Sequence, residues 1–384
     1  MRFELATPAR ILFGEGTLAE VPPAASAMGG RALVVTGASP GRAARLMASL
    51  VEAGVTSVPL AVAGEPDVDL IRRGAEMARE ERCGLVIAMG GGSAIDAGKA
   101  LAAMLTNPGD PLDYLEVIGA GRPLRQASAP FIAIPTTAGT GSEVTRNAVL
   151  ASPEQRVKAS LRSASMLPRL AVVDPELTLG LPRAITASTG LDALTQLIEP
   201  YVSVRANPMT DLFCVDGIRR AAAALPRAWE DGGDCEARRE MAWCSLLGGL
   251  ALANAGLGAV HGFAAPVGGM FPAPHGAVCA AVLPHAMEIN IRAMRRRAPD
   301  GEALRRFEEI ARLVTGRPHA TAEDGAEWIA HLVRRLEIPP LRTYGVSRDD
   351  VPALVEKAAK ASSMKGNPIA LTAEEMGEII TPAI

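Results

Sequence analysis

Short apolar runs alternate with longer helical patterns through the first half of the chain. The runs are rich in β-branched residues and lie at 31–36, 57–62, 84–90 and 131–136. Between the first three runs, the stretches 40–54 and 67–82 carry apolar residues three and four positions apart, as amphipathic helices do. This alternation predicts βαβ units, and therefore a parallel sheet with helices on both faces.

Helical periodicity dominates the second half of the chain. Patterns typical of helices occupy 184–203, 207–224, 236–257, 302–315, 321–335 and 372–381. A chain of 384 residues also exceeds the length of about 250–300 residues at which a single core stops growing. We therefore predict an α/β domain over residues 1–182 and an all-helical domain over residues 183–384.

Charge and composition narrow the classes of partner. The formal net charge of -3 and the pI near 6.1 give no electrostatic reason to bind nucleic acid or an anionic membrane. The stretch 245–271 has no charged residue and is long enough to span a bilayer, but Asn254, His261, Pro266 and several glycines favour packing inside a globular core. We expect neither membrane insertion nor a signal peptide.

The five cysteines are scattered along the chain and include no CxxC pair. This pattern argues against a disulfide framework and against a thiolate zinc site. Reduced thiols are typical of the cytoplasm, which is the expected location of the protein.

A glycine-rich turn directly after the run 84–90 is the first candidate for chemistry. The sequence GGGSAIDAGKA places Gly90, Gly91, Gly92 and Ser93 where a strand passes into a helix. Glycines let the backbone approach a phosphate closely, and the free amides at a helix start stabilise its negative charge. The motif is neither GxGxxG nor the Walker pattern, and a plain structural turn is the alternative.

A second polar loop follows the run 131–136. In PTTAGTGSEVT, the hydroxyls of Thr136, Thr137, Thr140 and Ser142 offer hydrogen bonds to a phosphate or a ribose. Two such loops at the carboxyl ends of parallel strands would share one edge of the sheet, where doubly wound folds bind their ligands. Together the loops predict a dinucleotide site.

Polar residues in the second half indicate a metal site. In GLDALTQLIEP, a helix would place Asp192 and Gln196 on one face, one turn apart. His261 and His275 are two of only five histidines and stand at the ends of a Pro/Gly-rich segment. Imidazoles suit Fe(II) and Zn(II), and a carboxylate from another helix would complete three ligands; two structural histidines are the alternative.

Taken together, these motifs resemble those of the iron-dependent, or group III, alcohol dehydrogenases. The resemblance runs nearly end to end, through ILFGEGTL, GGGSAIDAGKA, PTTAGTGSEVT, VKASL, AVVDPEL, GLDALTQLIEPYVS, PHGAVCAAVLPHAMEIN and GNPIALTAEEMGEII. It implies an amino-terminal α/β dinucleotide-binding domain with a parallel sheet and an all-helical carboxy-terminal domain, an architecture like that of dehydroquinate synthase. It also implies NAD(P)-dependent hydride transfer between a small alcohol and its aldehyde or ketone, with the carbonyl polarised by a divalent metal.

The resemblance assigns roles to individual residues. The positions that match cofactor-binding residues are Gly90, Gly91, Gly92, Ser93, Asp96, Thr136, Thr137, Thr140, Ser142 and Lys158. Asp192, His261 and His275 match metal ligands, and the two histidines are expected to be catalytic as well. A homodimer is the family expectation for the assembly.

Two departures from the family pattern concern the metal. Gln196 stands where the family usually has a histidine, and Ala265 stands four residues after His261, where many members carry another histidine. An amide oxygen binds Fe(II) or Zn(II) more weakly than an imidazole does, so metal affinity should fall. Asp192, Gln196 and the two imidazoles would still form an altered site for Fe(II) or Zn(II). Ala265 removes a group able to relay a proton.

A third departure concerns the cofactor. Many NAD-preferring members have Thr-Asp after the first buried strand, and this aspartate repels a 2′-phosphate; the present chain has Thr36, Gly37, Ala38 and Ser39. Gly37 removes the repulsion, and Ser39 or Arg42 can contact that phosphate. The sequence is compatible with NAD or NADP and slightly favours NADP.

Three other functions remain open at this point. A metal-independent reductase of the maleylacetate reductase type would use His261 or His275 directly as the proton donor. A lyase of the dehydroquinate synthase type needs clustered lysines and arginines for a phosphorylated, carboxylated substrate, and lysine is scarce in the second half before Lys357. A degenerate binding protein is disfavoured by the intact cofactor loops.

Overall fold

The computed structural model describes residues 2–155 and 157–384, and these form two compact units. The α/β unit comprises Ala6–Thr137 and Gly141–Thr178. The helical unit comprises residues 2–5 with Ala138–Thr140 and Leu179–Ile384. The predicted boundary between residues 182 and 183 falls at the start of the first long helix of the helical unit.

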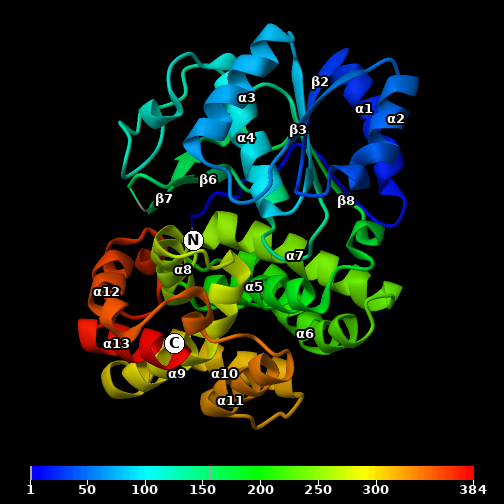
Figure 1. The fold of residues 1–384 in the computed structure, drawn as a ribbon. Helices are drawn as coiled ribbons and strands as arrows, with labels where there is room; N and C mark the ends of the chain where they lie inside the picture. Colours follow the sequence, from blue (N-terminus) through cyan, green and yellow to red (C-terminus); the bar gives the residue numbers. More distant parts are fainter. Residues whose placement is uncertain (1, 156) are drawn as a thin grey trace. The chain divides into compact units, whose positions relative to one another are not determined.

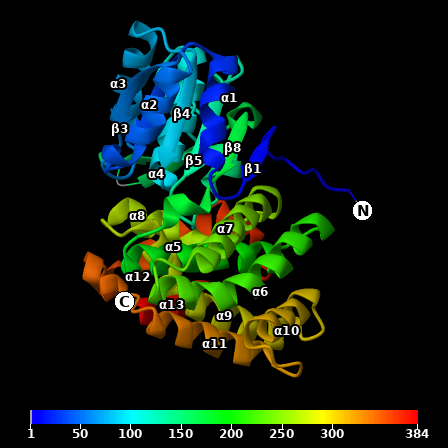
Figure 2. The ribbon, with the colours of Figure 1, turned by 90° about the vertical axis from the view of Figure 1, so that its right-hand side faces the viewer.

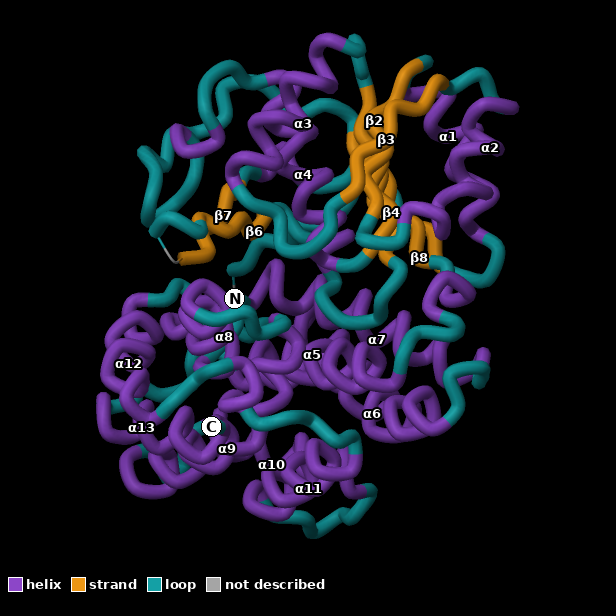
Figure 3. Tube along the Cα trace, viewed as in Figure 1, coloured by secondary structure: helices purple, strands orange, loops and turns teal. Residues whose placement is uncertain are grey.

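Within the described residues, the α/β unit is built on a six-stranded sheet whose neighbouring strands are all parallel (Figure 3). In order across the sheet, the strands are β1 (Ile11–Phe13), β8 (Leu170–Val173), β5 (Phe131–Pro135), β4 (Leu85–Gly90), β2 (Arg31–Thr36) and β3 (Thr56–Ala61). All residues of β4 and β5 are buried, which explains why their sequences are continuous apolar runs rather than alternating patterns. The four predicted runs correspond to β2, β3, β4 and β5, with ends that differ by at most one residue.

Helices cover both faces of this sheet (Figures 1 and 2). They are α3 (Val68–Glu80) and α4 (Gly92–Thr106) on one face, and α1 (Val21–Met28) and α2 (Ala44–Glu52) on the other. Leu33 and Val35 of β2 pack with α3 and α4, whereas Val34 packs with α1 and α2, because successive side chains of a strand point to opposite faces. The predicted α/β architecture with a parallel sheet is confirmed.

Some strands of the α/β unit lie outside the predicted pattern. β1 and β8 have three and four residues, which is too short for a periodicity to be recognised. A separate antiparallel hairpin, formed by β6 (Asn147–Ser152) and β7 (Val157–Arg162), follows the second polar loop. Polar residues stand at both ends of β6 and at every second position of β7, so neither strand is a continuous apolar run like those of β4 and β5.

The helical unit packs around α5 (Arg183–Val202), which is buried without interruption from Gly190 to Val202. The other helices are α6 (Pro208–Glu230), α7 (Cys235–Ala255), α8 (Ala259–Met270), α9 (His275–Arg297), α10 (Glu302–Thr315), α11 (Ala322–Arg335), α12 (Val351–Lys360) and α13 (Ala373–Ile380). Leu194, Phe263 and Phe307, from three different helices, belong to one hydrophobic core. The predicted all-helical second half is confirmed.

Helices α8 and α9 correct the prediction for the segment between the two histidines. That segment was expected to be a Pro/Gly-rich turn, but most of it is helix α8. Pro266 lies inside α8 and Pro284 inside α9. Because proline usually breaks a helix, these residues hide both helices from a reading of the sequence.

The apolar stretch 245–271 divides between α7 and α8. Among the described residues, no single helix is long and apolar enough to cross a bilayer. The two helices meet the length and composition criteria only as a pair, and the pair is bent by 98°.

Candidate metal centre and cofactor loops

Three polar side chains lie along one buried face of α5. Asp192, Gln196 and Glu199 follow one another at intervals of four and three residues, which places them on successive turns of the same face. Their exposed fractions are 1%, 2% and 6%. Because a buried carboxylate must be paired or must bind a cation, the partners of Asp192 and Glu199 decide the chemistry of this face.

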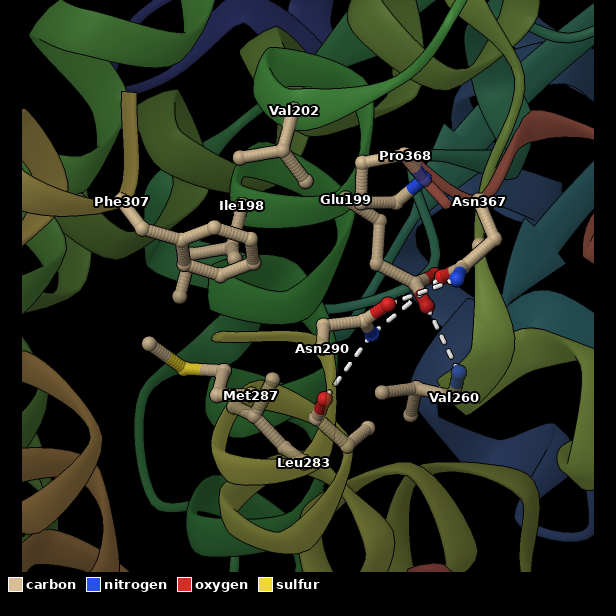
Figure 4. Close-up of a pocket in the computed structure, with 12 residues that line it drawn as sticks. Ile198, Glu199, Val202, Val260, Leu283, Met287, Asn290, Phe307, Asn367 and Pro368 are labelled. Carbon is tan, nitrogen blue, oxygen red and sulfur yellow. Dashed lines mark hydrogen bonds between the residues drawn. The ribbon is translucent and has the colours of Figure 1, made fainter. Parts of the chain in front are cut away.

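Glu199 fixes the start of α8. Its Oε1 accepts a hydrogen bond from Val260 N at 2.7 Å, and Asn367 Oδ1 accepts one from Ala259 N at 3.1 Å. Figure 4 shows the Glu199 and Asn367 side chains meeting beside Val260. They supply the acceptors that the first amides of a helix lack. Gly258 leaves room for them, because a Cβ there would lie 3.0 Å from Glu199 Oε1.

His261, in the first turn of α8, lies between two carboxylates. Its Nδ1 donates to Glu199 Oε2 at 2.6 Å, and its Nε2 lies 3.4 Å from Asp192 Oδ1. In a neutral ring with its proton on Nδ1, the Nε2 lone pair would face the carboxylate oxygen, so either a second proton or a metal ion must lie between these two acceptors. Burial opposes a charge on the ring, but Cys279, Glu199 and Asp192 outweigh it and raise the pKa of His261 well above its ordinary value.

His275, the first residue of α9, approaches the same carboxylate from another helix. Its Nε2 lies 3.7 Å from Asp192 Oδ1, and its ring centroid lies 5.3 Å from that of His261. Gly276 allows this approach, because a Cβ at that position would lie only 2.7 Å from the backbone oxygen of Ser188 on α5.

A cysteine completes the cluster. Cys279 follows His275 by one turn of α9, and its Sγ lies 3.6 Å from His275 Nε2 and 3.8 Å from His261 Nε2. One donor atom from each of Asp192, His261, His275 and Cys279 lies within 4.8 Å of the others. Burial opposes a charge on His275, but Cys279 and Asp192 raise the pKa of His275 to about 9. Burial also acts to raise the pKa of Asp192, yet the charges of His275 and His261 lower it overall.

The cluster has the chemistry of a metal site. Asp192 Oδ1 is buried and has no hydrogen-bond partner of good geometry among the described residues. A carboxylate oxygen that faces two imidazole nitrogens and a sulfur offers a divalent transition metal the donors it prefers. The Glu199 carboxylate behind His261 orients one of these donors, as is usual for metal-binding histidines. The residues therefore fit a divalent metal.

Gln196 and Ala265, the two departures from the family pattern, occupy different surroundings. Gln196 shares the face of α5 with Asp192, but its Oε1 lies 3.6 Å from the position that a Cβ of Gly248 on α7 would take. That oxygen is buried and has no hydrogen-bond partner among the described residues. Ala265 is exposed on α8.

In the α/β unit, the carboxyl ends of β2 and β4 meet where the strand order reverses, the position at which doubly wound sheets bind ligands. Gly90 permits the close approach, because a Cβ there would lie 3.2 Å from Gly37 N and 2.6 Å from the Ala94 Cβ. Gly91 precedes α4 without a side-chain cap, and the first amide with a helical partner is that of Ile95, so the amides of residues 92–94 have none. This helix start is suited to binding an anion.

The loop after β5 lies against the same turn. Thr136 N donates to Gly90 O at 2.9 Å, and Thr137 Oγ1 lies 3.5 Å from the position of a Gly91 Cβ. Ser93 is half-buried in the first turn of α4. The hydroxyls and the helix start are therefore adjacent, as the sequence predicts for one binding edge.

Asp96 of α4 holds the continuation of this loop. Its Oδ1 accepts a hydrogen bond from Ser142 Oγ, and its Oδ2 accepts one from Val149 N at 3.0 Å. Lys99, fully buried, lies 3.0 Å from Asp96 Oδ1 and donates to Ser142 O at 3.0 Å. Burial raises the pKa of the adjacent Glu143 to about 7. Asp96 and Ser142, both predicted to bind the cofactor, are thus bonded to each other.

The residues predicted to select the cofactor lie after β2. Around Gly37, no described atom outside its chain neighbours lies within 4 Å of the position of a Cβ. Ser39 is exposed, and Arg42 donates to the backbone oxygen of Leu177 at 2.6 Å. The Arg42 side chain is therefore held by the protein in this conformation.

Two further predicted cofactor residues occupy different surroundings. Lys158 of β7 forms an ion pair with Glu65 at 3.2 Å, and 7% of its side chain is exposed. Thr140 belongs to the short segment that groups with the helical unit. The sequence gives no signal for either placement.

Cys279 and Glu199 are the site residues that the sequence analysis misses. Cys279 follows His275 by four residues and Glu199 follows Asp192 by seven, and both intervals keep two side chains on one helix face. Cys279 belongs to no CxxC pair, and its helix lies outside the predicted ones. The absence of paired cysteines excludes a thiolate zinc site built on them, but not a single cysteine ligand in a mixed cluster.

Comparison with known proteins gives a consistent family. Residues 8–175 match the family model of iron-containing alcohol dehydrogenase, and residues 186–384 match that of the carboxy-terminal domain of the Fe-containing alcohol dehydrogenase family. Alcohol dehydrogenase 4 of Schizosaccharomyces pombe is 38% identical, over 98% of this chain and 88% of the relative. The 1,3-propanediol dehydrogenase of Citrobacter freundii is 35% identical, over 99% of this chain and 98% of the relative.

A solved structure of a 1,3-propanediol oxidoreductase superposes with a TM-score of 0.91 at 34% identity and covers 100% of both chains. The predicted fold class is thereby confirmed over the whole chain. Members of the matching family use NAD(P) and an iron-type metal, and the cluster around Asp192 is a possible site for that metal. The chain belongs to the iron-containing alcohol dehydrogenase family, and it is an NAD(P)-dependent oxidoreductase that interconverts alcohols and their aldehydes or ketones.

Proposed function

We propose that Asp192, His261 and His275 hold a divalent metal, Fe(II) or Zn(II), at which a small alcohol and its carbonyl compound are interconverted. The observation that carries this proposal is the buried Asp192 Oδ1, which faces two imidazole nitrogens without a hydrogen bond from the described residues. A metal held by these residues would supply Lewis-acid polarisation of the carbon–oxygen bond and would stabilise negative charge on the substrate oxygen. The sequence assigns a further ligand position to Gln196.

We assign catalytic roles to His261 and His275. Glu199 accepts a hydrogen bond from His261 Nδ1–H and so keeps Nε2 directed at Asp192. His275 is the more accessible of the two, with 36% of its side chain exposed against 6% for His261. A substrate oxygen therefore reaches the cluster on the side of His275.

The cofactor is proposed to bind residues 1–182, and the metal and substrate residues 183–384. The amides at the start of α4 receive the pyrophosphate, because they are free of helical partners and lie at the switch point of the sheet. The proposed cofactor-binding residues are Gly37, Ser39, Gly90, Gly91, Gly92, Ser93, Asp96, Thr136, Thr137, Thr140, Ser142 and Lys158. Asp96 acts by holding Ser142 in place.

NADP is proposed to be slightly preferred over NAD. Gly37 offers no negative charge to a 2′-phosphate, and the space around it would accept a side chain. Gly37→Asp should therefore lower kcat/KM for NADP by tenfold or more while NAD is retained, since about 1.4 kcal/mol of repulsion corresponds to a factor of ten. An unchanged ratio of the two kcat/KM values would refute the preference.

We further propose a homodimer in the cytoplasm whose partner is its small-molecule substrate rather than a nucleic acid or a membrane. The net charge of -3 supports the absence of nucleic-acid and membrane partners. The cysteines of the described residues form no disulfides, which supports the cytoplasmic location.

The function is tested with purified protein, a panel of short alcohols and aldehydes, and both cofactors. We expect a change in the absorbance of reduced nicotinamide with at least one pair of substrates. Asp192→Asn should lose the activity and the bound metal together. Activity that persists in this variant and in chelator-treated protein would instead indicate a metal-independent reductase.

A further inference from the structure

Cys279 occupies a position in the metal cluster that the resemblance does not assign. Its side chain is fully buried, and its Sγ lies 3.6 Å from His275 Nε2 and 3.8 Å from His261 Nε2. It stands on α9 one turn after His275, so one short stretch of helix presents both donors. A carboxylate oxygen of Asp192 lies within 4.8 Å of this sulfur, and Asp192 Oδ1 has no hydrogen bond from the described residues.

Four separations between these donor atoms, those that join an imidazole nitrogen to the Asp192 oxygen or to the Cys279 sulfur, are close to the edges of a coordination tetrahedron. Zinc bonds of about 2.0–2.1 Å to nitrogen or oxygen and about 2.3 Å to sulfur separate neighbouring ligands by about 3.4 Å for nitrogen and oxygen, and by about 3.6 Å for nitrogen and sulfur. The observed nitrogen–oxygen distances are 3.4 and 3.7 Å. The observed nitrogen–sulfur distances are 3.6 and 3.8 Å.

Gln196 is a poorer candidate for the same role. Its Oε1 lies 3.6 Å from the position of a Gly248 Cβ on α7 and is buried without a hydrogen-bond partner among the described residues. An amide oxygen is also neutral and a weaker donor to Zn(II) than a thiolate. A thiolate with the Asp192 carboxylate would balance the charge of a divalent ion in a site that is almost fully buried.

We propose that Cys279 binds the metal as a thiolate, in place of the histidine that Gln196 has replaced, and that the resulting Asp192, His261, His275 and Cys279 site prefers Zn(II) to Fe(II). This inference rests on the proposed metal site. The soft sulfur donor favours zinc over ferrous iron. A zinc ion held by these four residues would polarise a substrate oxygen by expanding its coordination, as zinc sites sometimes do.

Cobalt provides a spectroscopic test that does not depend on activity. Chelator-treated, full-length protein is reconstituted with Co(II), and the near-ultraviolet region is examined for the charge-transfer band of a thiolate bound to cobalt. We expect the band in the wild type, its loss in Cys279→Ser, and its retention in Cys244→Ser. Cys244 is the matched control, because it is also fully buried in the helical unit but its sulfur contacts the backbone oxygen of Gly217.

Gln196→Ala separates the two candidate ligands. We expect this variant to keep the charge-transfer band. Its cobalt affinity should fall by less than about tenfold, which is the smallest loss typical of removing a residue that orients a metal ligand. Loss of the cobalt spectrum in Gln196→Ala, with the spectrum unchanged in Cys279→Ser, would overturn the inference.

X-ray absorption of the zinc-loaded wild type needs no variant to fold. We expect one sulfur scatterer at about 2.3 Å together with nitrogen or oxygen scatterers at about 2.0–2.1 Å. Metal bound by nitrogen and oxygen alone would overturn the role of Cys279 and leave the proposed metal site standing. Failure to bind either metal would overturn both proposals.

Discussion

Glu199 is the residue on which the orientation of His261 depends. Its carboxylate accepts a hydrogen bond from His261 Nδ1 at 2.6 Å and another from the backbone nitrogen of Val260 at 2.7 Å. Glu199→Gln keeps the size of the side chain but presents an amide to one of these donors. We expect metal affinity to fall by about 10–100-fold, measured by competition with a chromophoric chelator. The control, Glu356→Gln, breaks an exposed ion pair with Lys360 and should leave the metal affinity unchanged. Equal metal affinities in the two variants would contradict the role of Glu199.

Glu143 gives the α/β unit a titration near neutral pH. Its pKa is raised from 4.5 to about 7 by burial, so the folded state binds the proton more tightly than the unfolded state. The stability that this group contributes is present below about pH 4.5 and is lost as the pH rises through about 7, a loss of at most about 3 kcal/mol. The glutamine of Glu143→Gln cannot titrate, so the free energy of unfolding of this variant should depend less on pH between about 4.5 and 7.

The measurement for Glu143 is urea unfolding of the wild type and Glu143→Gln at about pH 5 and about pH 8. Relative to the wild type, the variant should have a larger free energy of unfolding at the higher pH than at the lower pH. The exposed Glu374→Gln serves as a control for the removal of one charge. Parallel profiles for Glu143→Gln and the wild type would refute the prediction.

The sequence reveals individual residues only where their spacing or rarity carries a signal. Asp192, His261 and His275 stand out because histidines are few and the family motifs surround them. Cys279 and Glu199 carry no such signal, since each becomes meaningful only when its helix is known. Asp96 shows that a residue can also stand out for a different reason than its motif suggests. The motif suggests ligand binding, but the Asp96 oxygens accept hydrogen bonds from Ser142 and Val149 of the protein itself.

Helix α9 depends on a glycine for its contact with α5. A Cβ at Gly276 would lie 2.7 Å from the backbone oxygen of Ser188, and neither backbone can yield easily. Gly276→Ala should lower the free energy of unfolding by about 1–3 kcal/mol and weaken metal binding, because His275 moves with the helix start. Gly377→Ala is the control: apart from its chain neighbours and the backbone of its own helix, no described atom lies within 4 Å of its Cβ position, so alanine should stabilise α13 by about 0.5–1 kcal/mol. Equal effects of both substitutions on urea unfolding would contradict the packing argument.

Elements with an uninterrupted periodicity could be predicted, and elements stabilised by tertiary contacts could not. Helices α5, α6, α7, α10, α11 and α13 correspond to predicted patterns. The first amides of α8 bond side chains from other helices, Glu199 and Asn367, so no local capping residue announces this helix. α9 contains Pro284, which the sequence pattern treats as a break.

At the scale of the whole molecule, the fold class follows from the change in hydrophobic period near residue 180. The buried parallel strands give continuous apolar runs, and the helical half gives intervals of three and four residues. The hydrophobic period does not predict which unit a short connecting segment joins. Residues 138–140 group with the helical unit, although they lie between elements of the α/β unit. Grouping of that kind depends on contacts between distant residues rather than on local pattern.

All three tryptophans, Trp229, Trp243 and Trp328, lie in the helical unit, so tryptophan fluorescence reports the unfolding of the unit that holds the metal cluster. A metal that binds only the folded cluster adds to the free energy of unfolding. Zinc at a hundred times its dissociation constant should therefore raise the fluorescence-detected value by about 2.7 kcal/mol. Asp192→Asn removes the carboxylate that faces both histidines and should abolish this increase. An equal increase in the variant would show that zinc stabilises the unit from a different site, and the cluster would lose its assignment as the metal centre.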